Sequence, residues 1–178
     1  MASEISEFDL DAYKRIRENV MMFIKSASLK FDRSSIRLLD IAPQDHEGAK
    51  QFFHNAEVLT ADIDPNSNAD FIVDICSKNC SVIPNNHFDV VLCMEVLEHT
   101  LNPFAAVSEI RRMLKPGGTV FISTPFNFRI HGPLPDCWRF TVHGLQALLR
   151  EFKSVEIEEL EDKNRFLMPF HYTTVAVK

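Results

Sequence analysis

Acidic side chains follow four short apolar runs of the sequence. Asp40, Asp62, Asp74 and Glu95 each stand at or near the end of such a run. The carboxyl ends of parallel strands meet at one edge of a sheet, and ligands bind there. Asp62 follows Asp40 by 22 positions, close to the about 20 that separate a nucleotide-binding turn from the acid that holds the ribose. The four residues favour a nucleoside-like ligand, although aspartate is also common simply because it starts turns well.

A second set of reactive side chains lies in and near the segment 124–141. His131 has an ordinary pKa near 6.5, which suits a general base that deprotonates a hydroxyl. Asp136 in the same segment and His99 before it are the alternative bases. The sequence therefore indicates acid–base chemistry, with His131 as the first candidate.

The same segment combines three prolines with the only tryptophan of the chain. A stiff loop that mixes aromatic and polar groups suits an acceptor pocket. We expect Trp138 and Arg139 to contact the acceptor. The alternative is that Trp138 covers the sheet while Arg139 pairs with a surface acid.

Alternating helices and strands must position these groups. Residues 7–28, 46–55, 103–115 and 142–152 have the features of helices, with Ser6, Asn102 and Thr141 as expected N-caps. Strands are expected at 37–41, 57–61, 71–73, 88–94, 119–123, 154–160 and 170–177. Runs that are apolar on both faces suit a parallel sheet with helices on each side. The order predicts an α/β fold, a Rossmann-like, doubly wound, mostly parallel sheet whose last strand is antiparallel.

Length and composition favour a single globular domain of 178 residues, with residues 1–30 packed as a helix on the α/β core. The net charge of −6 and the absence of a basic face argue against a nucleic-acid partner. No secretory signal and no apolar run of about 18 residues is evident, so we expect a cytoplasmic protein with reduced cysteines and no membrane partner. Self-association stays open.

No metal is expected from the sequence. Cys76 and Cys80 are four positions apart, but the closely spaced cysteine pairs of strong zinc patterns are missing.

The most specific motif is FDVVLCMEVLEH at 88–99, followed by Pro103 and by IRRMLKPGG at 110–118. With LLDI at 38–41, DID at 62–64 and VDI at 73–75, it resembles the class I S-adenosylmethionine-dependent methyltransferases, specifically the methyltransferase domain 11 group. The resemblance runs from about residue 37 to 152. It implies S-adenosylmethionine as cofactor and O- or N-methylation of a small-molecule or glycan-like acceptor, since the loop PDCWRFT at 135–141 is similar to one found in members that belong to glycan or natural-product pathways.

The resemblance also implies roles for individual residues. Asp62 matches the family position that holds the ribose, within a motif that includes Ile63. Asp74 matches the acceptor for the adenine amino group, with Ile75 beside the ring. Met94 and Glu95 match the segment under the methionine part, and His99 matches a position that borders the active site.

The first motif departs from the family, which writes D-x-G-x-G-x-G after the first strand. Ala42, Gln44 and His46 stand where glycines are expected, and the next glycine is Gly48. We expect Asp40, Ala42, Gln44 and Gly48 to border the cofactor, with the Gln44 side chain either crowding or contacting it.

The altered loop supports one alternative function, a non-catalytic methyltransferase-like binding subunit. A nicotinamide-dependent oxidoreductase fits badly, because no G-x-G-x-x-G follows the first strand.

Overall fold

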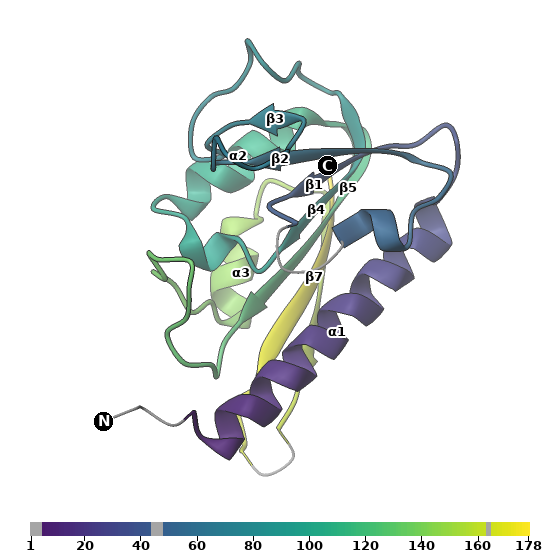
Figure 1. The fold of residues 1–178 in the computed structure, drawn as a ribbon. Coiled ribbons are helices and arrows are strands. Elements are labelled where there is room, and N and C mark those ends of the chain that lie inside the picture. The colour runs from purple at the N-terminus through teal and green to yellow at the C-terminus, as the bar shows by residue number, and fades with distance from the viewer. Residues whose placement is uncertain (1–4, 44–47, 163–164) are drawn as a thin grey trace.

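The computed structural model describes residues 5–43, 48–162 and 165–178. These residues form one seven-stranded sheet with helices packed against it (Figure 1). In chain order the elements are α1 (Glu7–Phe31), β1 (Arg37–Ile41), the 3-10 helix η1 (Gly48–Gln51), β2 (Glu57–Asp62), β3 (Phe71–Ile72), β4 (Phe88–Met94), the 3-10 helix η2 (Leu97–His99), α2 (Pro103–Met113), β5 (Leu114–Pro125), α3 (Val142–Leu148), β6 (Ser154–Leu160) and β7 (His171–Val177).

The strand order is β3-β2-β1-β4-β5-β7-β6. The pairs among the first five strands are parallel, whereas β7 is antiparallel to both β5 and β6. This confirms the predicted mostly parallel sheet and its antiparallel last strand. The chain moves outward from β1 to β3 and then returns to the other side of β1 with β4. That reversal is the point at which an open α/β sheet binds its ligand.

Apolar side chains alternate between the two faces of the sheet, because successive residues of a strand point to opposite sides. Leu38, Val90 and Phe121 belong to the core under α1, which buries Ala12, Ile16, Val20, Ile24 and Ala27. Leu39, Val91 and Val120 face the opposite core, which α2 and α3 cover. Figure 1 shows α1 crossing one face and the other two helices on the far face.

Each α-helix begins at the N-cap that the sequence predicts. The Ser6 hydroxyl accepts from the Asp9 amide at 3.1 Å, the Asn102 side chain from the Ala105 amide, and the Thr141 hydroxyl from the Gly144 amide. Such caps satisfy amides that have no partner inside the helix.

Strands and helices do not alternate between β2 and β4, where no individual helix was expected, and two expected helices differ in extent. Residues 63–87 contain only the short strand β3 and turns, with no helix. Of the helix expected at 46–55, the described part is the 3-10 helix η1, and residues 44–47 lie outside the described ranges. The helix expected at 142–152 ends at Leu148.

The strand expected at 119–123 is longer, because β5 starts at Leu114 directly after α2. Its pairing with β4 shifts register between Phe88 and Val90. Gly117 has a φ of +78°, and a Cβ at Gly118 would lie 2.9 Å from the Lys115 carbonyl oxygen. Gly117 and Gly118 therefore allow the backbone to turn while it remains in β5.

Among the residues that the structure describes, no helix is long and apolar enough to cross a membrane. All four cysteines lie in this part of the chain and are free thiols.

The buried carboxylate of Glu109 in α2 joins this helix to the long connection between β3 and β4. The Glu109 carboxylate accepts from Arg112 at 2.7 Å and from the Asn79 amide at 2.7 Å. Burial opposes the charged form, but Arg112 and the Asn79 amide hold the pKa of Glu109 below its ordinary value.

We expect Glu109→Gln to lower the free energy of unfolding at neutral pH by about 1–2 kcal/mol, the cost of weakening charge-assisted hydrogen bonds. Because the folded pKa lies below the unfolded value, this stabilisation exists above about pH 4.3 and is lost as the pH falls further. Urea unfolding at a series of pH values should show the difference shrinking in acid. Exposed Glu18→Ala is the control, and an equal loss there would contradict the assignment.

Candidate active site

The carboxyl ends of four adjacent strands lie level with one another. Ile41 of β1 is in register with Ala61 of β2 and Cys93 of β4. The residues that follow, Ala42, Asp62 and Met94, therefore form one row along the sheet edge. β3 joins the row next to β2, where Asp62 pairs with Ile72. Strand register thus brings three of the predicted cofactor-binding positions, Ala42, Asp62 and Met94, together at this edge.

The turn after β1 carries its own conformational demands. Ala42 has a φ of 52°, in the left-handed region that glycine adopts most easily. Gly48 has a φ of +57°, and a Cβ there would overlap the Asp40 carboxylate and lie 2.7 Å from Pro43. Asp40 is buried and accepts from the Ala49 amide at 2.7 Å. Gly48 thus provides the close approach, whereas Gln44 lies outside the described residues.

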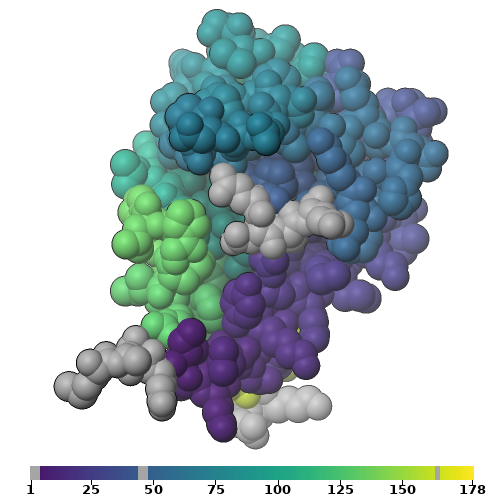
Figure 2. All heavy atoms as spheres, viewed as in Figure 1, coloured from purple at the N-terminus to yellow at the C-terminus, as the bar shows by residue number. Residues whose placement is uncertain are grey.

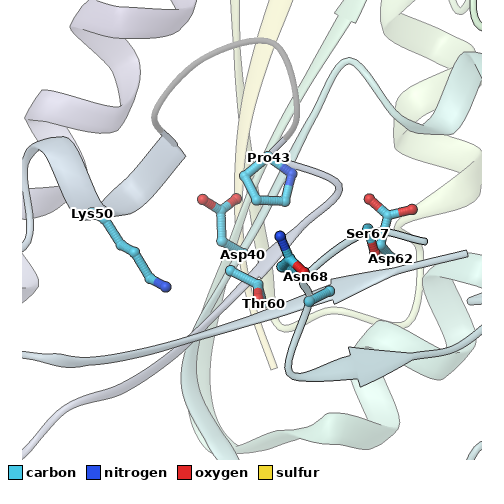
Figure 3. A pocket seen from close by; sticks show the side chains of 8 residues that line it. Asp40, Pro43, Lys50, Thr60, Asp62, Ser67 and Asn68 are labelled. Atoms are coloured by element: carbon cyan, nitrogen blue, oxygen red, sulfur yellow. The ribbon is translucent and has the colours of Figure 1, made fainter. Parts of the chain in front are cut away.

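A pocket opens at the ends of β1 and β2 (Figure 3). Its lining comprises Asp40, Pro43, Lys50, Thr60, Asp62, Ser67, Asn68 and Ala69. Asp62 is nearly buried, and its Oδ1 accepts from the Asp64 amide at 2.8 Å. The sequence analysis did not identify Lys50, the cation of this pocket, because a single lysine in a short helix carries no distinctive signal.

The remaining nucleoside-side residues differ in exposure. Asp74 is exposed and accepts from the Cys76 amide at 2.8 Å. Ile63 is 68% exposed, whereas Ile75 is only 7% exposed and packs in the core under α2 and α3. Of the two predicted isoleucines, Ile63 is therefore the one that presents an apolar surface.

Glu95 directly follows β4 and has a strained backbone, with a φ of 55°. Its Oε1 accepts from the Ser123 hydroxyl at 2.8 Å and lies 2.6 Å from His171 Nε2. Burial opposes the charged form, but His171 and Ser123 hold the pKa of Glu95 below its ordinary value. The His171 Nδ1 lies 2.9 Å from the side-chain nitrogen of Asn19. A polar chain therefore connects the end of β4 to α1.

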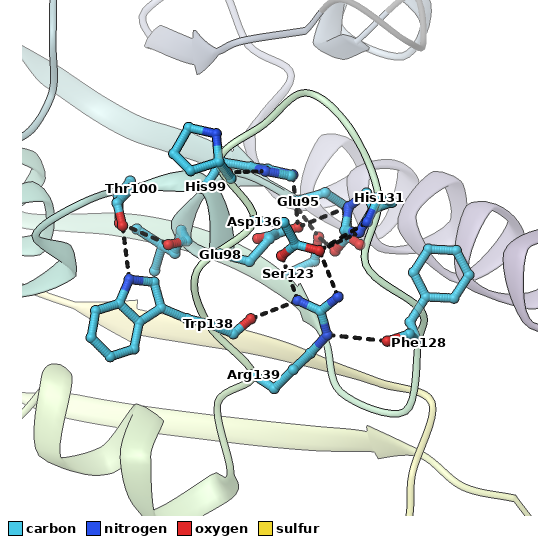
Figure 4. Close-up of polar contacts among 12 residues, drawn as sticks. Glu95, Glu98, His99, Thr100, Ser123, Phe128, His131, Asp136, Trp138 and Arg139 are labelled. Carbon is cyan, nitrogen blue, oxygen red and sulfur yellow. Dashed lines mark hydrogen bonds and ion pairs between the residues drawn. The ribbon is translucent and has the colours of Figure 1, made fainter.

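The loop between β5 and α3 folds back over η2 (Figure 4). The amides of Cys137 and Trp138 donate to the Glu98 carbonyl at 2.7 and 3.2 Å. The Trp138 indole donates to the Thr100 carbonyl at 2.7 Å, and its ring stacks on Phe140. Figure 2 shows this loop in green, beside the first turns of α1 in purple. Trp138 thus fastens the loop, and 41% of it remains exposed.

Arg139 uses all five N–H groups within the loop. It pairs with both oxygens of Asp136, at 2.5 and 2.7 Å, and donates to the carbonyls of Phe128, Arg129 and Trp138. This pairing lowers the pKa of Asp136 to about 2. Asp136 is therefore a poor proton acceptor near neutral pH, and Arg139 has the contacts of a residue that holds the loop.

The carboxylate of Glu98 lies fully buried between two histidines. Its Oε1 is 3.7 Å from His99 Nε2 and 3.8 Å from His131 Nε2. Burial, reinforced by the nearby Glu95 charge, raises the pKa of Glu98 well above its ordinary value. Burial likewise lowers the pKa of His131, although Asp136 opposes this. Glu98 and His131 are thus both biased toward their neutral forms.

The structure brings the three predicted acid–base residues His99, His131 and Asp136 to one place and adds Glu98, which the sequence analysis did not single out. The spacing of Glu98, three residues after Glu95 and next to His99, was the available signal. His171 also lies at the site. It could not be predicted there, because a single histidine at the start of a distant strand gives no local pattern.

Comparisons with known proteins agree with this geometry. Residues 12–169 match the family described as a methyltransferase domain. Over 82 residues the chain is 35% identical to the ubiquinone biosynthesis O-methyltransferase of Vibrio cholerae, which covers 46% of this chain and 29% of that protein. The chain thus spans less than a third of the length of this curated relative.

Two solved structures share the fold. A SAM dependent methyltransferase from Archaeoglobus fulgidus has a TM-score of 0.66 at 18% identity, over 97% of this chain and 100% of that chain. A phosphoethanolamine N-methyltransferase of Haemonchus contortus, in complex with S-adenosylhomocysteine, has a TM-score of 0.64 at 20% identity, over 86% of this chain and 52% of that chain. The family match and the sheet together show that this chain belongs to the methyltransferase-domain family, within the class I S-adenosylmethionine-dependent methyltransferases.

Proposed function

We propose that this protein transfers the methyl group of S-adenosylmethionine to a hydroxyl of a small-molecule acceptor. The observation that carries the proposal is the cluster of Glu98, His99 and His131, which places basic atoms beside the end of β4. A hydroxyl must lose its proton to become a good nucleophile, and such atoms promote that loss. The ubiquinone biosynthesis relative, named an O-methyltransferase, supports oxygen as the atom methylated.

The level strand ends supply the cofactor half of the site. Asp62 would accept from the ribose hydroxyls, and Asp74 from the adenine amino group, as the resemblance implies. Glu95 would lie under the methionine part, held by Ser123 and His171. The exposed side chain of Ile63 would flank the nucleoside.

The reaction is an in-line displacement at carbon. The bond between the acceptor oxygen and the methyl carbon forms while the bond from that carbon to sulfur breaks, and the electron pair stays on sulfur as S-adenosylhomocysteine leaves. The proton of the hydroxyl goes to His131 Nε2. Positioning supplies much of the acceleration, because the sulfonium is already an activated leaving group.

Incubation of the protein with radiolabelled S-adenosylmethionine and a small-molecule extract tests the function. Label in a product that mass spectrometry identifies as a methyl ether would support it. Label on nitrogen or on a glycan would show that the acceptor is not the hydroxyl of a small molecule. Binding of the cofactor without any labelled product would favour a non-catalytic binding subunit.

Asp62→Ala should weaken binding of S-adenosylhomocysteine by about 1–3 kcal/mol, because buried hydroxyl donors lose their acceptor. Titration calorimetry measures this change, with a thermal melt to show that the turn after β2 still folds. Asp64→Ala, at the neighbouring exposed carboxylate, is the matched control. Unchanged affinity in Asp62→Ala would remove this residue from the ribose site.

His131→Gln should reduce turnover by about a hundredfold or more while the affinity for S-adenosylhomocysteine stays nearly constant. Single-turnover kinetics on the acceptor found above provides the measurement. His143→Gln, at an exposed histidine in α3, should retain full turnover. Full turnover by His131→Gln would show that positioning alone drives the reaction.

A further inference from the structure

The Glu98 carboxylate is completely buried without a hydrogen-bond donor. Its side chain has 0% exposure, and among the described residues neither oxygen has a hydrogen-bond partner. Burying a carboxylate in this way costs free energy unless a positive group compensates it. The Nε2 nitrogens of His99 and His131 lie 3.7 and 3.8 Å from Glu98 Oε1, and one ligand atom from each of the three residues lies within 4.8 Å of the others.

The other ring nitrogens of both histidines face acceptors. His99 Nδ1 lies 3.0 Å from the Pro135 carbonyl oxygen, and His131 Nδ1 lies 3.1 Å from Asp136 Oδ2. A carbonyl or carboxylate oxygen accepts hydrogen bonds and cannot donate. The contact with Pro135 places the His99 proton on Nδ1 and leaves a lone pair on Nε2. The approach of His131 Nδ1 to Asp136 is an ion-pair contact without hydrogen-bond geometry, and the His131 Nε2 faces Glu98 at 3.8 Å.

Three electron-pair donors thus converge on one point. Histidines that bind metals almost always donate their other ring N–H to a carboxylate or backbone carbonyl, and His99 has such an acceptor in the Pro135 carbonyl. Two histidines with one carboxylate form a recurrent set that leaves further coordination positions open. Bonds of about 2.1 Å to one tetrahedral ion would place the donor atoms about 3.4 Å apart. The observed separations of 3.7 and 3.8 Å need only a small closure.

We infer that Glu98, His99 and His131 bind a divalent transition metal ion, with open positions for the acceptor hydroxyl. The sequence analysis expected no metal, because Glu98 and His99 lie 32 or more positions before His131 and only the fold brings them together. Arg139 and Asp136 fix the outer side of the site, since Asp136 orients His131 while Arg139 holds Asp136.

Metal binding does not depend on the proposed function, but its catalytic role rests on it. A hydroxyl bound to the ion loses its proton to water more easily, because the ion stabilises the alkoxide. In the loaded enzyme His131 then holds the ion, and the proton does not pass to its ring. The methyl transfer itself is the same displacement at carbon.

Spectroscopic titration with Co²⁺ tests the inference on the full chain after treatment with EDTA. We expect one equivalent to bind with ligand-field absorption of nitrogen and oxygen ligands, and Zn²⁺ to displace it. Glu98→Gln and His99→Gln should each weaken binding by about a hundredfold or more, and Asp136→Asn by about 10–100-fold. His143→Gln should bind as the wild type does, and thermal melts verify that each variant is folded.

The outcomes separate this inference from the proposed function. Absence of binding, or binding that folded Glu98→Gln and His99→Gln leave unchanged, overturns the metal site. A thiolate-to-cobalt charge-transfer band also overturns it, because the ion would then have a cysteine ligand, which the inferred site does not contain. Stoichiometric binding without any methyl transfer supports the metal site while the proposed function fails. Methyl transfer by protein that binds no metal retains the function, with His131 as the base.

Discussion

The burial of Glu98 is the constraint on which the loop over the sheet edge depends. The backbone carbonyl of Glu98 accepts hydrogen bonds from the amides of Cys137 and Trp138. Glu98 therefore holds in place the loop that buries its own carboxylate. The loop in turn brings His131 to the carboxylate. An uncompensated buried charge is costly, so the position of the loop and the orientation of both histidines depend on each other. The Arg139 guanidinium holds the loop in place with all of its N–H donors.

The sheet edge divides into two halves that meet at Glu95. The ends of β1, β2 and β3 lie on the side proposed for the nucleoside, and the end of β5 with its loop lies on the side proposed for the acceptor. Glu95 stands between them with a strained backbone, which Ser123 and His171 stabilise. Asn19 extends this network to α1, so the first helix contributes a polar contact as well as a core face.

The fold could be predicted well from the sequence, because its signals are local. Apolar runs identified β1, β2 and β4, and capping residues identified the starts of all three α-helices. No helix was expected at 63–87, all of which the structure describes, and none is present there, whereas the expected helix at 142–152 ends earlier, at Leu148. At the site, the aspartates could be placed because strand register aligns strand ends. Glu98 and His171 could not, because their roles arise from contacts with the loop after β5 and with β4, which no local spacing encodes.

The left-handed conformation of Ala42 has a consequence for recognising distant relatives. A left-handed residue other than glycine costs about 1–2 kcal/mol, an amount that a folded domain can absorb. Ala42 therefore adopts the left-handed conformation without being a glycine, and the close approach to Asp40 is made by Gly48. A search for a fixed glycine pattern would reject this sequence. A search that asks which positions must turn left-handed, and which must lack a side chain, would retain it.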